Sequence, residues 1–82
     1  MLILRKEKIV DPENIIDSNI RCIRIEKVIG QIDLVKQLQL NDVEITRETL
    51  VKIESGRQHI KLKQLKSIKK ILIVDYDEIL IK

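Results

Sequence analysis

Apolar residues recur through most of the chain at spacings of three and four positions, which is the pattern of amphipathic helices. The most regular stripe predicts a helix over about residues 61–72. Its members are Leu62, Leu65, Ile68 and Leu72. The first two predicted helices cover about residues 12–27 and about 31–38, and Gly30 separates them. This periodicity places the chain in the all-α class.

Start and stop signals mark the ends of the predicted helices. Asp11 suits an N-cap, and Pro12 suits the first position of the first helix. Thr46 can cap a further helix that runs to about Glu54. Gly56, just beyond it, can adopt the left-handed conformation that ends many helices. Four helices are therefore expected before the C-terminal segment.

The two ends of the chain are less regular. Residues 1–10 hold apolar positions around a charged run, which predicts a short strand, an extended arm or a disordered start. We expect an ordered arm that either adds to a dimer or covers the core of a domain spanning 11–82. At the other end, residues 71–74 suit either the end of a helix or a strand. Asp75, followed three residues later by Glu78, predicts a last short helix with a capping box.

The composition narrows the classes of function. The 82 residues are enough for one domain with a modest core. Hydrophobic residues make up 44% of the chain, and Tyr76 is the only aromatic one. Proteins that bind single strands or RNA stack bases on aromatic side chains, so those modes are not expected. The net charge of +3 permits binding to nucleic acid without identifying it.

The sequence offers little for catalysis, metal binding or a membrane. His59 and Cys22 are the only residues of their kinds, so we expect no metal site, no cofactor and no enzyme. Cys22 is expected to be a small packing residue beside the apolar stripe of the first helix. No apolar run approaches the roughly 18 residues of a membrane span. In the first ten residues the basic positions follow apolar ones, which is the reverse of the order in a signal peptide. A lone cysteine fits a reducing compartment. We therefore expect a cytoplasmic protein.

The segment 45–57, ITRETLVKIESGR, combines a helical pattern with a polar row. Ile45, Leu50 and Ile53 are spaced to face a core. The polar row consists of Arg47, Glu48, Thr49 and Lys52. A row of this kind is most often a solvated surface. Its donors and acceptors would equally suit the base edges in the major groove of DNA.

This segment resembles the phage-repressor-like helix-turn-helix family, also called the Xre or Cro/C1 family. The resemblance covers about residues 18–81 and is most specific in the Thr-Arg start, the Ile-Glu end and the Gly-Arg tail of the segment. Other positions that carry it are Arg24, Gln31, Leu34, Leu38, Leu65, Ile68, Leu72, Val74 and Leu80. It implies a five-helix, lambda-repressor-like domain of bacterial or phage origin. Such a domain places its third helix in the major groove, usually as a dimer on a palindromic site.

The resemblance also implies a role for individual residues. Base contacts are implied for Arg47, Glu48, Thr49 and Lys52, and phosphate contacts for Gln31, Arg57 and Gln58. Arg47 can pair bidentately with guanine, and Glu48 can accept from the amino group of cytosine. Gln31 would begin the second helix, where free N–H groups favour an anion. Arg24 and Glu54 would form a partly buried ion pair that joins the first helix to the end of the third.

The chain departs from the family at several positions. The connection QLNDVEI, residues 39–45, is longer than the usual turn of about three residues, although a sub-branch of the family has a similar insertion. Val28 and Ile73 stand where the family more often has glycine. We expect a homodimeric transcriptional regulator, a repressor, that binds double-stranded DNA. The alternative is a protein-interaction module, such as an antitoxin or antirepressor, with weak or no DNA binding, which the negative charge of Glu48 favours.

Overall fold

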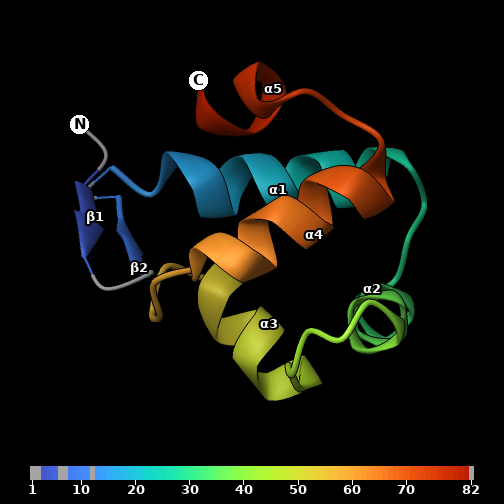
Figure 1. Cartoon of the computed structure of the whole chain (residues 1–82). Helices are drawn as coiled ribbons and strands as arrows, with labels where there is room; N and C mark the ends of the chain where they lie inside the picture. Colours follow the sequence, from blue (N-terminus) through green and yellow to red (C-terminus); the bar gives the residue numbers. More distant parts are fainter. Residues whose placement is uncertain (1–2, 6–7, 12, 82) are drawn as a thin grey trace.

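The structure is a computed structural model that describes residues 8–11 and 13–81, together with the backbone of residues 3–5. Five helices make up most of the described chain, as the periodicity predicted (Figure 1). They are α1 (Ile15–Glu26), α2 (Gln31–Leu40), α3 (Arg47–Glu54), α4 (Leu62–Leu72) and α5 (Tyr76–Leu80). Two short strands precede them, β1 (Ile3–Arg5) and β2 (Lys8–Val10).

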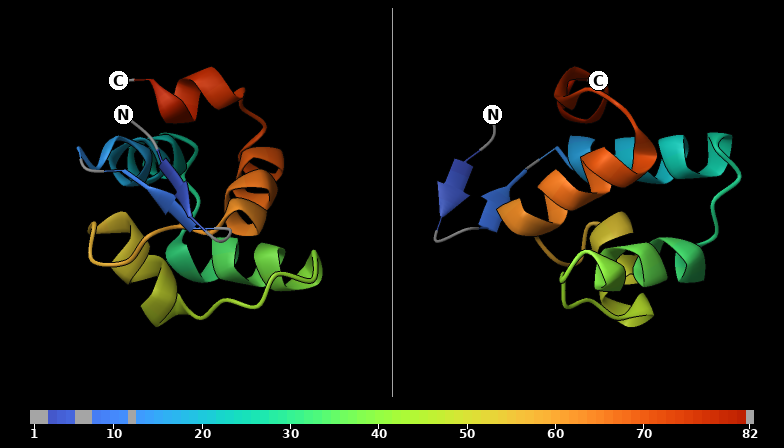
Figure 2. Two further views of the ribbon diagram at one scale, coloured as in Figure 1. Left: turned by 60° about the vertical axis from the view of Figure 1, so that its left-hand side comes forward. Right: turned by 45° about the vertical axis from the view of Figure 1, so that its right-hand side comes forward.

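The helices enclose one aliphatic core. Figure 2 shows α5 at one end of the molecule and α2 and α3 at the other, with α1 and α4 between them. α5 packs against α1, and α2 packs against both α3 and α4. The most deeply buried large side chains come from all five helices and are Ile16, Ile20, Leu34, Leu38, Leu50, Ile53, Ile68, Leu72 and Ile79. The described core is therefore built from Ile, Leu and Val.

The first helix begins later than the sequence predicted. Its N-cap is Asn14, which has a left-handed backbone with a φ of 55°. Asp11 lies before the helix and still stabilises its first turn, because its Oδ2 accepts a hydrogen bond of 2.6 Å from the N–H of Ile16. That N–H is one of the donors that a helix cannot satisfy internally. Pro12, predicted at the first helical position, lies outside the described residues.

The boundaries of α3 follow the predicted signals. The hydroxyl oxygen of Thr46 accepts a hydrogen bond from the N–H of Thr49 at 3.2 Å, so Thr46 caps the helix. At the other end, Gly56 has a φ of 78°, in the left-handed region where a side chain is strained. A Cβ at this position would also lie 3.0 Å from the side-chain oxygens of Asn14 and Asp17. Glycine is thus needed here for its conformation and for its size.

The C-terminal segment corrects two expectations. The strand alternative for residues 71–74 is wrong, because α4 continues to Leu72 and ends with Ile73 in the left-handed conformation. Asp75 precedes α5 as expected, but its side chain makes no capping hydrogen bond, so the predicted capping box is absent. α5 is instead tied to α1 by Asn19, whose amide donates to the carbonyl of Ile79 at 2.8 Å. Nothing in the local sequence indicated this long-range contact.

The N-terminal segment is a hairpin rather than a single arm. β1 and β2 pair antiparallel, and β2 also forms a bridge between Lys8 and Lys61, at the start of α4. The N–H of Ile9 donates to the carbonyl of Ile60 at 2.9 Å, and the Ile9 side chain is buried in the core. β2 therefore covers the core and belongs to the domain that was expected to begin at residue 11. A role of this segment in a dimer stays a prediction.

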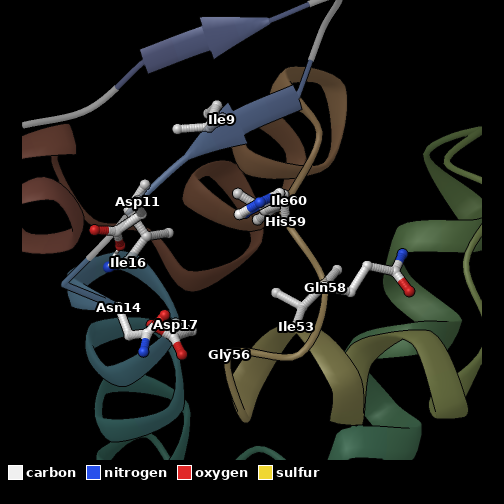
Figure 3. A pocket seen from close by; sticks show the side chains of 10 residues that line it. All are labelled: Ile9, Asp11, Asn14, Ile16, Asp17, Ile53, Gly56, Gln58, His59 and Ile60. Atoms are coloured by element: carbon white, nitrogen blue, oxygen red, sulfur yellow. Dashed lines mark hydrogen bonds between the residues drawn. The ribbon is translucent and has the colours of Figure 1, made fainter.

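Asp17 is a buried carboxyl group at the start of α1, beside Gly56 and a cavity of about 20 Å³ (Figure 3). Its Oδ1 accepts no hydrogen bond from the described residues. Burial raises the pKa of Asp17 above its ordinary value of 3.8, and the nearby Asp11 raises the pKa further. Hydrogen bonds from the backbone N–H groups of Ser18 and Asp17 act in the opposite direction without cancelling the rise. The ionised form of Asp17 is therefore disfavoured in the folded state.

This shift predicts how Asp17 affects stability at different pH. The unfolded chain loses the proton near pH 3.8 and the folded chain at a higher pH, so ionisation of Asp17 opposes folding. The penalty is complete above the folded pKa and disappears as the pH falls below 3.8. Asp17→Asn should therefore gain stability over the wild type at neutral pH and lose this advantage in acid. Urea unfolding across this pH range, with the exposed Glu13→Gln variant as control, measures it, and a difference independent of pH would contradict it.

Candidate nucleic-acid interface

The connection between α2 and α3, residues 41–46, is held firmly against the core. Val43 and Ile45 are buried, and the amide of Gln39 donates to the carbonyl of Ile45 at 2.9 Å. Asp42 takes the left-handed conformation with a φ of 61°, which an aspartate tolerates better than most residues. The long connection therefore fixes α3 beside α2 instead of leaving it loose.

α3 turns a polar row away from the core. Arg47, Glu48 and Lys52 are exposed, whereas Leu50 and Ile53 on the opposite side are fully buried. Glu48 and Lys52 lie four residues apart, so they are neighbours one turn apart on the helix surface. Arg47 stands in the first turn, close to the free end of the helix. The structure thus brings three of the four expected base-contact residues together on the outer face of α3.

Thr49, the fourth of these residues, is only half-buried and already has a structural role. Its hydroxyl lies 3.1 Å from the hydroxyl of Thr46, and its N–H donates to the same Thr46 oxygen. Both groups belong to the N-cap of α3. The Thr49 hydroxyl accepts in this contact, so its own O–H remains free to donate, and its methyl group remains free for an apolar contact.

The loop after α3 presents Arg57 and Gln58, both exposed. The backbone N–H of Arg57 donates to the carbonyl of Lys52 at 2.8 Å, and its Nε donates to the hydroxyl of Ser55 at 3.0 Å. The Ser55 hydroxyl in turn donates to the carbonyl of Lys52 at 3.1 Å. The loop therefore holds the guanidinium of Arg57 near the C-terminal end of α3, beside the polar row.

Arg24 on α1 and Glu54 on α3 form a buried ion pair that joins the two helices. The Nε of Arg24 lies 2.7 Å from Oε2 of Glu54, and its Nη2 lies 2.9 Å from Oε1, so the pair is bidentate. The two side chains are only 10% and 3% exposed. Arg24 also donates through Nη1 to the carbonyl of Ile29 at 2.8 Å. The contact expected between these residues is present, and it joins α1, the α1–α2 connection and the end of α3.

Gln31 is the first residue of α2, as expected, but its side-chain amide already has a partner within the protein. Its side-chain nitrogen donates to Oε1 of Glu54 at 3.1 Å, so the amide belongs to the buried network. One of its two N–H donors remains for another acceptor. Beside it, a shallow hollow is also lined by Arg21, Val51 and Ser55. Arg21 is an exposed cation on α1, and no local pattern in the sequence points to it, because only the folded chain brings α1 next to α3.

The charge of this region is balanced. Residues 31–58, which span α2, the connection, α3 and the following loop, contain four basic and five acidic side chains. Three of the acidic residues, Asp42, Glu44 and Glu48, are exposed in the connection or on α3. Any attraction to a polyanion here would thus come from individual cations and not from a uniformly positive surface.

Comparison of the chain with family models, with curated proteins and with solved structures finds no match. In the described part of the chain, no helix combines the length and the apolarity that a membrane crossing requires. Among the same residues, no three of the types His, Cys, Asp and Glu gather closely enough to hold a metal ion. Cys22 is exposed on α1, so its expected packing role is wrong. The helical stripe of α1 turns that position outward.

Proposed function

We propose that this protein binds double-stranded DNA through a lambda-repressor-like helix-turn-helix formed by α2, the connection and α3. The observation that carries the proposal is the exposed polar row of α3, on a helix whose orientation the buried Arg24–Glu54 pair fixes. A rigid, amphipathic helix with free donors at its N-terminal turn suits the major groove. We further propose a homodimeric transcriptional regulator, a repressor, whose two copies would read a palindromic site.

In this proposal the residues have distinct tasks. Arg47 and Lys52 donate to guanine, and Glu48 accepts from cytosine, so α3 supplies the sequence preference. Arg57 and Gln58 contact phosphates and set the position of the helix on the duplex. These backbone contacts release counterions, which makes the affinity fall as salt rises. Gln31 adds to the backbone contacts through its second amide proton.

Binding to genomic DNA fragments, including the protein's own promoter, across a salt series tests the proposal. The wild type should prefer one fragment, with an affinity that decreases steeply with salt. Arg47→Ala should reduce the preference for that fragment over random DNA by about 1–3 kcal/mol, because a bidentate base contact is lost. Lys36→Ala removes the same charge from an exposed position on α2 and serves as the control, which should keep the preference.

A second candidate function is a protein-interaction module with weak or no DNA binding. It is favoured by the exposed Glu48 near the centre of the polar row and by the balanced charge of residues 31–58. Under this alternative no genomic fragment binds better than random DNA, even at low salt. Arg47→Ala and Lys36→Ala would then behave alike. That result would remove the proposal of a DNA-reading helix.

A further inference from the structure

The positive charge of the chain is concentrated on one helix. Residues 61–74 contain five lysines and no acidic residue. The chain has 16 Lys and Arg and 13 Asp and Glu, so without these lysines 11 basic residues would face 13 acidic ones. The net positive charge therefore comes from the segment that contains α4, and the rest of the protein is slightly acidic.

Three of the lysines form a straight row on the exposed side of α4. Lys63, Lys66 and Lys70 are all exposed, and their spacings of three and four place them on one helix face. Leu65 and Ile68 lie on the opposite face and are buried in the core. The row covers seven residue steps, or about 10 Å along the helix axis at about 1.5 Å per residue. We call these three residues the α4 lysine row.

The α4 lysine row works against the stability of its own helix. Lys66 has a lysine three residues before it and another four residues after it, and like charges at these spacings destabilise a helix. Within the described part of the chain, no carboxylate forms an ion pair with these lysines. Lys69, beside the row, places its ammonium 4.9 Å from the centre of the Tyr76 ring. Lys70 is favoured by the C-terminal end of the helix, but Lys63 and Lys66 are not. Sequence features that oppose folding are expected at functional sites.

We propose that the α4 lysine row binds the phosphate backbone of duplex nucleic acid without regard to sequence. Lysine is a compact point charge that suits phosphates in varied geometry, whereas protein interfaces are depleted in lysine. Single strands are a poorer match because the one aromatic ring nearby, Tyr76, already contacts Lys69. α4 crosses the front of the molecule above α3 in Figure 1, so this contact belongs to a different element from the proposed reading helix. It does not depend on α3 reading DNA.

Two variants with the same change in charge test the proposal. Lys66→Gln/Lys70→Gln removes two charges from the row, and Lys27→Gln/Lys36→Gln removes two exposed charges from elsewhere. The readout is binding to a random-sequence duplex over a salt series. The row variant should make the negative slope of log affinity against log salt shallower by about 2, because each phosphate contact contributes about −0.9 to it. The control variant should keep the wild-type slope.

A third variant separates binding from folding. Lys66→Glu places a carboxylate four residues before Lys70, in the orientation that favours a helix. It should therefore melt at a higher temperature than the wild type while binding the random duplex at least about tenfold more weakly at low salt. Equal slopes in the two double variants, or an unchanged affinity of Lys66→Glu, would overturn the proposal. The duplex carries no preferred site, so neither result depends on whether α3 reads sequence. Arg47→Ala should therefore leave the slope of log affinity against log salt within about one unit of the wild-type slope.

Discussion

Glu54→Ala is expected to lower the free energy of unfolding by about 3–5 kcal/mol, because it leaves the guanidinium of Arg24 buried without its carboxylate. The side chain of Arg24 is 10% exposed and that of Glu54 is 3% exposed, so water replaces the lost partner poorly. The amide of Gln31 loses its acceptor at the same time. A domain of this size has a total stability of about 4–12 kcal/mol, so the variant should lose a large fraction of it.

Urea unfolding of two further variants separates charge from packing. Glu54→Gln keeps the shape of the side chain and removes the charge, so it should lose stability through the unpaired guanidinium. The double variant Arg24→Met/Glu54→Leu leaves no buried charge and should recover most of the loss. If Glu54→Ala costs less than about 1 kcal/mol, the pair behaves as an exposed salt bridge and cannot fix the orientation of α3.

The helices and the core could be predicted because their signals are local. Thr46 and Gly56 act within α3 itself, and the apolar stripe of α4 needs no knowledge of its partners to be recognised. The local sequence did not decide the structure of segments that suit both a strand and a helix. Three of the residues 71–74 are β-branched and suited a strand. Leu72 instead continues the buried stripe of Leu65 and Ile68, and the N–H groups of Ile73 and Val74 donate to carbonyls of the last turn of α4.

The candidate site was predictable only in part, because its geometry depends on contacts between distant residues. The polar row of α3 follows from one helix, and its exposure agrees with the sequence pattern. The contact of Gln31 with Glu54 spans 23 positions, and Arg21 joins the surface only through the packing of α1. The N-terminal hairpin also depends on a long-range contact, since Lys8 of β2 forms a bridge with Lys61. Periodicity contains no information about such pairs.

The division of charge between α3 and α4 suggests how the two proposed surfaces would complement each other. A reading helix with Glu48 on its exposed face gains selectivity by repelling phosphates wherever the base contact is missing. The same charge weakens general attraction to DNA. The α4 lysine row would supply that attraction on another helix, without altering which sequence α3 prefers.

Val28→Gly combined with Ile73→Gly is expected to raise the free energy of unfolding by up to about 3 kcal/mol. Both residues are β-branched and adopt the left-handed conformation, with φ of 56° and 55°. This conformation costs an L-residue about 1–2 kcal/mol, and glycine removes the cost at a loss of about 0.4–1 kcal/mol in unfolded-state entropy. The side chains are 90% and 84% exposed, so almost no packing is lost.

Thermal unfolding measures this gain, since each kcal/mol moves the midpoint by about 4–8 °C in a domain of this size. Gly56→Ala is the matched control, because it introduces a side chain at a left-handed position where a Cβ meets the oxygens of Asn14 and Asp17 at 3.0 Å. It should lower the midpoint while the double glycine variant raises it. If the glycine variant melts below the wild type, Val28 and Ile73 stabilise the fold through contacts that their exposure does not reveal. Their backbone strain would then be an obligatory cost of those contacts and not a defect that glycine relieves.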